Sequence, residues 1–430
     1  MHEHALRRQL HNEIHARPYE RVLTPGLISH MAFVADAVQQ EQAHAHLCAL
    51  LADHHLPLPA AEGSYYAADV GRVRLRWERH GEFNSYTFVR PGLATAAADW
   101  FAQPAWAEIA ADWRASIPGQ LISANHVALL PEVDDLHAAG PGDAALDAVL
   151  DADALIASEV ADAQARVYTD LRIHADGCTR FVVLSRALTP RRRGRLTQRL
   201  LEIETYRMLA LLALPDARRI MPQLAALERA LGDLMDAIRS GRAGDDRATL
   251  EQLSDLASTV EGVYAQHHAR FTASAAYYDL VGRRVADLHE RPFDGLQSIG
   301  QFLDRRLTPA MQTCAAAQRR LQGLSERIAR CSGLLRTRVD VDVQQHNREL
   351  LASMNRRQYL QLRLQQTVEG LSVAAITYYA STLVGHLLTP LQHWSGIDPA
   401  LAQGMSIPPI ALALWLALRR AHHQIGAAEH

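Results

Sequence analysis

The chain has 430 residues, of which 48% are hydrophobic, so it is long enough for two or three domains with a sizeable core. Its formal net charge of −3 gives no reason to expect nucleic acid as a partner. All 44 strongly basic residues are Arg, and the lack of Lys excludes a Walker-type phosphate loop and a Schiff-base lysine.

The cysteines and the N-terminal residues indicate the compartment. Cys48, Cys178, Cys314 and Cys331 have no C-x-x-C spacing, which argues against a zinc site or a disulfide framework and favours a reducing compartment. Residues 1–18 lack the apolar run of a signal peptide. Both observations predict that the bulk of the chain stays in the cytoplasm.

Residues 1–187 are predicted to form a cytoplasmic mixed α/β domain. In the segment VRLRW (73–77), apolar residues alternate with Arg, the period-two pattern of a half-buried strand. The Asp176-Gly177 pair predicts a hairpin turn. The expected elements are helices at 5–16, 36–53 and 100–113, strands at 27–35, 72–79, 83–89, 120–130, 166–174 and 178–185, and a linker or exposed helix at 131–162.

Two polar groups in this domain are candidate sites. His11 and His15 are four residues apart on one face of the first predicted helix, a spacing that can bind a transition metal, and Glu13 and Arg17 lie beside them in the sequence. The alternative is a polar network that holds this helix against the sheet.

The second group is Glu78, His80 and Glu82, at the predicted hairpin turn through Gly81. Two carboxylates and an imidazole within reach of one another can tune a general acid or base near neutral pH. The alternative is ordinary solvated polarity at a hairpin tip.

From residue 188 to 366 the pattern predicts a bundle of long helices and a stalk. The segment 307–331 carries a heptad, with one position occupied by Leu307, Cys314, Leu321 and Ile328 and the other by Ala310, Ala317, Leu324 and Cys331. This coiled-coil seam fits an intramolecular antiparallel pair or a contact in a homo-oligomer. Residues 334–388 are expected to form one continuous helix.

Residues 367–421 are predicted to form a transmembrane hairpin, followed by a short cytoplasmic tail at 422–430. Leu371–Leu388 has almost the length of a bilayer core, about 30 Å, and a second apolar run at 407–418 reaches that length when extended back to Leu401. Arg residues flank the pair, and the loop 389–406 has none, so both termini are expected on the cytoplasmic side of a bacterial inner membrane. The alternative is a buried helical hairpin in a soluble bundle.

The first of these helices carries two further patterns. The small residues Gly370, Ala374, Ser381 and Gly385 permit close helix packing. The polar stripe of Gln365, Glu369 and Ser372 would place a ring of carboxylates at a pore mouth in a homo-oligomer and attract divalent cations. The alternative for Glu369 is a local pair with Arg363.

Five segments resemble a bacterial family of uncharacterised membrane-anchored proteins, domain of unknown function 3422. They are HNEIHARP (11–18), WERHGEF (77–83), LLRTRVDV (334–341), SMNRRQYLQLRLQQTVEGLSVAAITYY (353–379) and PPIALALWLALRR (408–420). The resemblance implies a membrane anchor and supplies no activity, substrate or catalytic residue.

The predicted architecture also resembles that of CorA-type magnesium channels. Those carry a Gly-Met-Asn triplet at the outer end of the first span, where this chain reads GHLLTPLQHW (385–394) and has Gly404-Met405-Ser406 farther on. The selectivity filter is therefore not reproduced even if the scaffold is shared.

The sequence thus predicts an α+β protein with two C-terminal transmembrane helices, and it leaves two classes of function open. One is an oligomeric CorA-like ion channel or transporter, and the other is a non-catalytic membrane-anchored scaffold or sensor. No nucleophile elbow, phosphate loop or dinucleotide fingerprint is present, so an enzyme ranks third and no cofactor is indicated.

Overall fold

The computed structural model describes residues 3–4, 6–8, 11, 18–61, 63–94, 96–132, 143–240, 246–293, 295–388 and 398–427. Contacts between residues divide the chain into two compact units, Met1–Ser332 and Gly333–His430. Each unit is described by itself.

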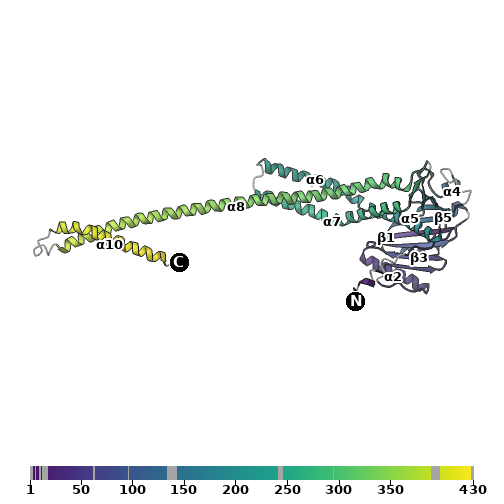
Figure 1. Ribbon diagram of the computed structural model, residues 1–430, viewed down its shortest axis with the longest axis horizontal. Helices are drawn as coiled ribbons and strands as arrows, with labels where there is room; N and C mark the ends of the chain where they lie inside the picture. The colour runs from purple at the N-terminus through teal and green to yellow at the C-terminus, as the bar shows by residue number, and fades with distance from the viewer. Residues whose placement is uncertain are drawn as a thin grey trace. The chain divides into compact units, whose positions relative to one another are not determined.

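The first unit is built on a nine-stranded sheet with the strand order β2-β3-β4-β1-β5-β8-β7-β6-β9 (Figure 1). The strands β5 and β8 pair in parallel, and the other neighbours pair antiparallel. The strands are β1 (Gly26–Val34), β2 (Tyr65–Val70), β3 (Val73–Arg79), β4 (Phe83–Pro91), β5 (Gln120–Pro131), β6 (Ile156–Val160), β7 (Ala165–Thr169), β8 (Thr179–Ser185) and β9 (Arg291–Pro292).

Short helices connect the strands, and long helices follow them. The short ones are η1 (Ala97–Asp99), η2 (Ala105–Glu108), α3 (Ala111–Ala115), α4 (Ala144–Asp147) and η4 (Ala152–Ala154). The longer ones are α2 (Ala37–Asp53), α5 (Pro190–Leu211), α6 (Leu214–Arg239), α7 (Asp246–Asp287), α8 (Ile299–Leu388) and α10 (Pro399–Ala427).

The sheet is buried on both faces, and each face has its own core. Successive side chains of a strand point to opposite faces, so Leu27 and Ile28 belong to different cores. One core contains Trp77, Phe88 and residues of α2, and the other is formed with α5 and the long helices. A residue on either face of this sheet is therefore held between packed layers.

Most predicted elements of this unit are confirmed. Strands lie at 26–34, 73–79, 83–91 and 120–131, and α2 begins after Asp36, whose side chain forms a capping box with Gln39. The predicted hairpin around Asp176-Gly177 exists as the antiparallel pair β7–β8, although β7 ends earlier than expected, at Thr169.

Two predictions in this unit are wrong. Residues 100–113 do not form one helix, because Pro104 interrupts the segment and the three short elements η1, η2 and α3 bring Trp100 and Trp106 onto the sheet. The stretch 131–162 is not simply a linker or exposed helix, since it contributes the buried strand β6.

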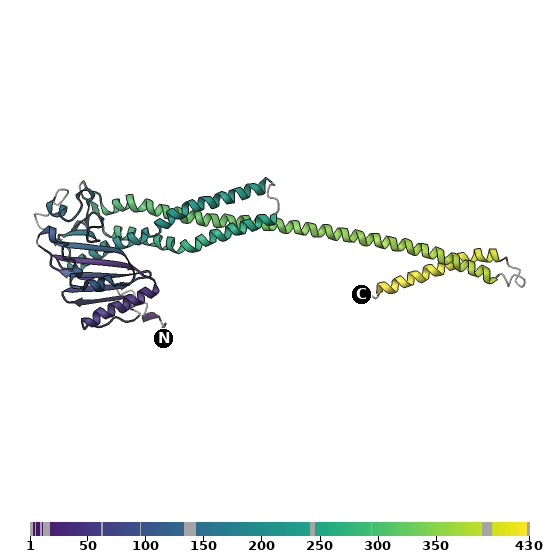
Figure 2. The ribbon, with the colours of Figure 1, turned by 180° about the vertical axis from the view of Figure 1, so that it is seen from behind.

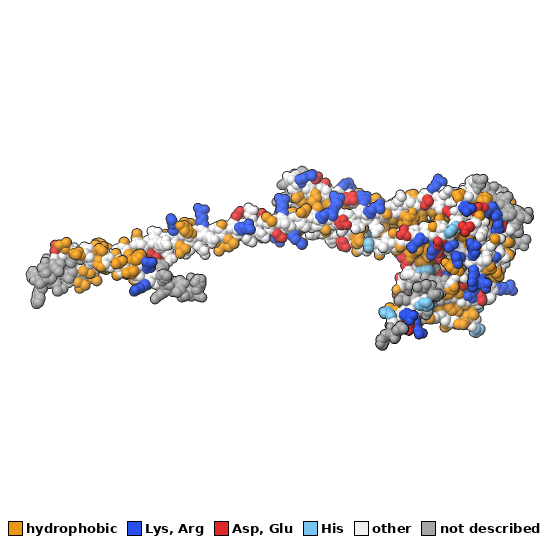
Figure 3. Space-filling model, viewed as in Figure 1, with side chains coloured by type: hydrophobic (Ala, Val, Ile, Leu, Met, Phe, Trp, Pro, Cys, Tyr) orange, Lys and Arg blue, Asp and Glu red, His pale blue; other side chains and the backbone are white. Residues whose placement is uncertain are grey.

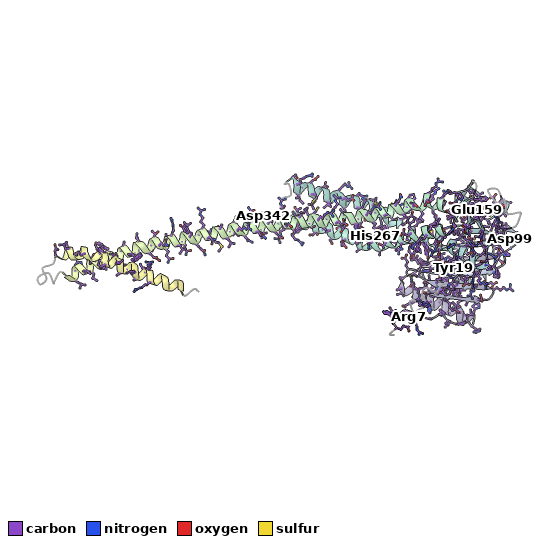
Figure 4. The ribbon with its side chains drawn as sticks, in the orientation of Figure 1. Arg7, Tyr19, Asp99, Glu159, His267 and Asp342 are labelled. Atoms are coloured by element: carbon purple, nitrogen blue, oxygen red, sulfur yellow. The ribbon has the colours of Figure 1, made fainter. Side chains whose placement is uncertain are left out.

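The long helices of the first unit pack against one another. Figures 1 and 2 both show α6 and α7 beside α8, and the Arg320 guanidinium of α8 binds the Glu228 carboxylate of α6 with a 3.0 Å bond from Nε. His267 of α7, labelled in Figure 4, lies 3.4 Å from Asp216 of α6. The heptad residues Leu307, Cys314, Leu321 and Ile328 are all buried in the core shared with these helices. These heptad residues therefore pack within the chain, as the intramolecular alternative predicted.

The second unit consists of the C-terminal part of α8 and α10. The side chains of Thr382 on α8 and Gln403 on α10 are within 3.4 Å, and Gln403 also packs against Gly385. Many large apolar side chains are exposed on this part of α8, among them Leu350 and Met354. Figure 3 shows orange hydrophobic atoms at intervals along this helix.

The predicted transmembrane hairpin is overturned. Among the described residues, no helix combines the length and the hydrophobicity that crossing a bilayer requires. Thr377, Ser381 and His386 interrupt the first apolar run, and Gln403 precedes the second. The predictions of two transmembrane helices and of an inner-membrane location are wrong on this finding.

Candidate functional site: a polar cavity between the sheet and α5

A row of polar side chains crosses three strands on the sheet face that α5 covers. In β3 the odd-numbered residues Val73, Leu75 and Trp77 belong to the core on the α2 side, so Arg76 and Glu78 project to the α5 side. The strand register continues the row laterally across the sheet. Arg76 pairs with Thr87 of β4, Thr87 pairs with His30 of β1, and Glu78 pairs with Ser85.

The helix α5 closes this polar row into a cavity. Thr197, Leu201 and Thr205 recur at a spacing of four residues and line the cavity together with Gln198 and Glu202. The cavity is partly open, and the centre of a water-sized molecule has about 40 Å³ of space in it. A single water needs roughly 10–15 Å³ on this measure, so the space suits about three waters or a molecule of similar size.

The N-terminal segment lines one side of the cavity. The ring of Tyr19, labelled in Figure 4, lies 5.0 Å below the Arg195 guanidinium of α5. A Cβ added to Gly194 would lie 1.8 Å from the backbone carbonyl oxygen of Glu20, so only glycine permits this approach. The Glu20 side chain also lines the cavity, where it accepts hydrogen bonds from Tyr65 (3.2 Å) and Arg74 (3.4 Å).

A buried ion pair forms the floor of the cavity. Arg76 Nη2 donates to Glu78 Oε1 at 2.8 Å, Arg76 Nη1 donates to Gln198 Oε1 at 2.9 Å, and both charged residues are less than 9% exposed. Arg76 Nε and the Thr197 hydroxyl are also buried, and neither has a hydrogen-bond partner among the described residues. An unsatisfied buried polar group costs about 1–3 kcal/mol, so these atoms favour occupancy of the cavity by a hydrogen-bonding molecule.

His30 is held as a neutral imidazole. Its Nδ1 lies 2.9 Å from the Thr87 hydroxyl, and its Nε2 lies 3.3 Å from the Thr205 hydroxyl. Burial, together with smaller contributions from Arg76 and His80, lowers the pKa of His30 to about 3. His30 therefore supplies a polar wall and no charge at neutral pH.

The cavity is directly connected to α7. Glu202, which lines it, accepts hydrogen bonds from Gln198 Nε2 at 2.7 Å and from Arg284 of α7. A rearrangement of Glu202 inside the cavity would therefore change an ion pair between two long helices.

The predicted group at the β3–β4 turn is divided between two environments. Glu78 and His80 line the cavity, and the His80 ring stacks on Phe83 with centroids 4.1 Å apart. Glu82 instead accepts hydrogen bonds from Arg270 of α7, including one of 3.1 Å from Nη1. This turn is packed against the helical part of the unit.

The N-terminal group of predicted candidates is described only at His11. His11 is exposed, whereas Glu13, His15 and Arg17 lie outside the described residues. In the part of the chain that the structure describes, no three His, Cys, Asp or Glu side chains are arranged to hold a metal ion.

The candidates on α8 lie in the second unit. Gln365 Nε2 donates to Glu369 Oε1 at 3.0 Å, and the Ser372 hydroxyl donates to the Val368 carbonyl. Of the predicted packing residues, Ser381 is buried and Gly385 contacts Gln403, whereas Ala374 is exposed and Gly370 has open space beside it. The pore-mouth role remains an untested prediction.

A buried serine and histidine on the opposite face invite comparison with a catalytic pair. Ser29 Oγ lies 2.8 Å from His126 Nδ1, and Ser29 also accepts a bond from the Ala105 amide. Both residues are at most 1% exposed, and the rings of Phe101 and Trp106 cover His126. No substrate can reach this pair, so it serves to satisfy buried polar groups.

The fold and the cavity define a class: a mixed α/β protein whose sheet and covering helix line a small polar cavity. The chain belongs to the family described as "Protein of unknown function (DUF3422)", whose model matches residues 2–425. Searches among curated proteins and among solved structures found no match to the chain. The family resemblance is thus confirmed, and the CorA-type resemblance receives no support.

Proposed function

We propose that this protein is a small-molecule sensor, in which the polar cavity binds a ligand and α5 transmits its presence to α7. One observation carries the proposal. Glu202 lines the cavity and is also the α5 partner of Arg284 on α7. A ligand that binds one arrangement of Glu202 better than another shifts the packing of the two helices accordingly.

The packing around the cavity supports this coupling. The α5 residues Thr197 and Gln198 meet the sheet residues of the same cavity, and Phe83 beside it contacts Tyr206 of α5 and Tyr277 of α7. A ligand in the cavity would therefore contact residues that pack the sheet against α5 and α7.

The other predicted functions have weaker support. A channel requires membrane-spanning helices, and the described ranges hold none that qualifies. A scaffold requires a free docking surface, and the heptad seam that suggested one is buried within the chain.

Hydrogen–deuterium exchange of the full chain tests the proposal. The probes are acetamide, acetate and acetamidinium at millimolar concentration, three planar molecules of matched size and different charge. We expect at least one probe to slow exchange in α5 and in the part of α7 around Arg284, with no change in α2. If none of the three alters exchange in α5 or α7, the sensor proposal is wrong.

A pair of variants tests the route between the helices. Glu202→Gln keeps the shape of the side chain and weakens its bond to Arg284, so the active probe should still protect α5 but no longer α7. Glu228→Gln is the control, because Glu228 pairs with Arg320 and does not line the cavity. Protection of α7 that survives Glu202→Gln would exclude this route.

A further inference from the structure

We infer that the ligand of this cavity is a small neutral amide, of the size of acetamide or urea. The inference rests on the proposed function, since it names the chemical class that the same site binds. It draws on the size, the charge balance and the hydrogen-bonding groups of the cavity.

Size favours a small molecule as the ligand. The space of about 40 Å³ corresponds to roughly three waters. Acetamide and urea, with four non-hydrogen atoms each, are of this order.

Charge balance favours a neutral ligand. Each of the three carboxylates that line the cavity already has an arginine partner: Glu78 pairs with Arg76, Glu20 with Arg74 and Glu202 with Arg284. His30 is neutral at physiological pH because burial lowers its pKa to about 3. An added ion would be an unpaired charge among buried groups, which is strongly unfavourable.

The hydrogen-bonding groups complement an amide. Arg76 Nε–H and the Thr197 hydroxyl are buried donors without a partner among the described residues, and a carbonyl oxygen is a suitable acceptor for either of them. Glu78 accepts the Arg76 hydrogen bond through Oε1, and its Oε2 is a second carboxylate acceptor on a residue that lines the cavity. An amide NH₂ group is a donor suited to this carboxylate.

The Arg76–Glu78 pair therefore presents a donor and an acceptor side by side. A carboxamide presents the opposite pair, an acceptor and a donor on one carbon. Acetate lacks the donor, and acetamidinium lacks the acceptor, although both have the shape of acetamide.

Calorimetric titration of the full chain with these three probes tests the inference. We expect acetamide to bind at least tenfold more tightly than acetate or acetamidinium. Thr197→Val removes one donor with little change in shape and should weaken acetamide binding roughly tenfold. Thr249→Val is the control, because Thr249 is also buried but lies on α7 and does not line the cavity, so affinity should be unchanged.

A charge variant makes the test sharper. Glu78→Gln leaves the Arg76 charge without its carboxylate, so the preference should change from acetamide to acetate. Binding of acetate or acetamidinium in preference to acetamide by the unaltered protein would overturn the amide inference and leave the sensor proposal standing. If no probe binds, both are wrong.

Discussion

At the scale of single residues, His30 shows how burial determines chemistry. Both ring nitrogens are matched to threonine hydroxyls, and burial keeps the ring uncharged. His126 behaves similarly on the other face of the sheet, where burial lowers its pKa to about 4. Each of these histidines is neutral in the folded chain at pH values where an exposed histidine is protonated.

The first prediction is that His30 makes stability depend on pH. Between pH 6.5 and about 3 the unfolded chain binds a proton at this position and the folded chain does not, so the free energy of unfolding falls as pH falls through this window. The contribution of one such histidine is at most about 1.4 kcal/mol per pH unit.

Unfolding by guanidinium chloride at pH 7 and pH 5.5 measures the effect. In His30→Gln, the decrease in the free energy of unfolding between the two pH values should be smaller than in the unaltered protein. The decrease that His126 causes should remain. An equal loss in both proteins would show that His30 is not held neutral.

At the scale of elements, the position of α5 depends on one close approach. The N-terminal segment passes so near Gly194 that an added methyl group would overlap the Glu20 backbone. This contact fixes how α5 covers the polar row of the sheet. The glycine is required by proximity, since it lies inside a helix and not at a turn.

The second prediction compares two glycines inside helices. Gly194→Ala should destabilise the protein by several kcal/mol, as expected when a packed backbone must move. Gly232→Ala on α6, where a Cβ meets nothing within 4 Å, should be neutral or stabilising by up to about 1 kcal/mol. Thermal unfolding of both variants measures the difference, and equal melting temperatures would contradict the close packing of α5.

At the scale of the whole molecule, the two units differ in how they are stabilised. The two large hydrophobic cores lie in Met1–Ser332, whereas large apolar side chains of Gly333–His430 are frequently exposed. Helices without a packed apolar face derive little stability from tertiary contacts.

The third prediction is that the units unfold separately. Trp77, Trp100 and Trp106 are buried in the first unit, so tryptophan fluorescence mainly reports on that unit. In guanidinium chloride, the circular dichroism signal of helix should begin to fall before the fluorescence changes. Coincident transitions would indicate that the two units unfold as one.

Much of the first unit could be predicted from local patterns. The alternation in VRLRW placed β3, and Asp36 marked the start of α2 through its capping box. The prediction of one helix at residues 100–113 was wrong. The aromatic residues there pack on the sheet from short helical turns, and their spacing also matches a helical period. The transmembrane prediction was wrong because apolar runs of moderate length were extended across polar residues such as Gln403.

The candidate site was found only in part from the sequence. Glu78 and His80 were recognised because they cluster near one turn, whereas Arg76, His30, Thr197 and Glu202 were not. An arginine in an alternating strand, such as Arg76 in β3, is normally expected on a solvent-exposed face. That expectation is wrong here because α5 covers the face of the sheet from which Arg76 projects.

The sequence by itself determined the family, the alternation of the strands and the boundaries of several elements, since these depend on neighbouring residues and on the period of their side chains. Only the tertiary structure decided which polar residues share a cavity. His30 and Thr205 are 175 positions apart in the chain, and their contact depends on how the sheet and α5 pack as whole layers. Local patterns do not encode such contacts, because they arise from the burial of both sheet faces at once.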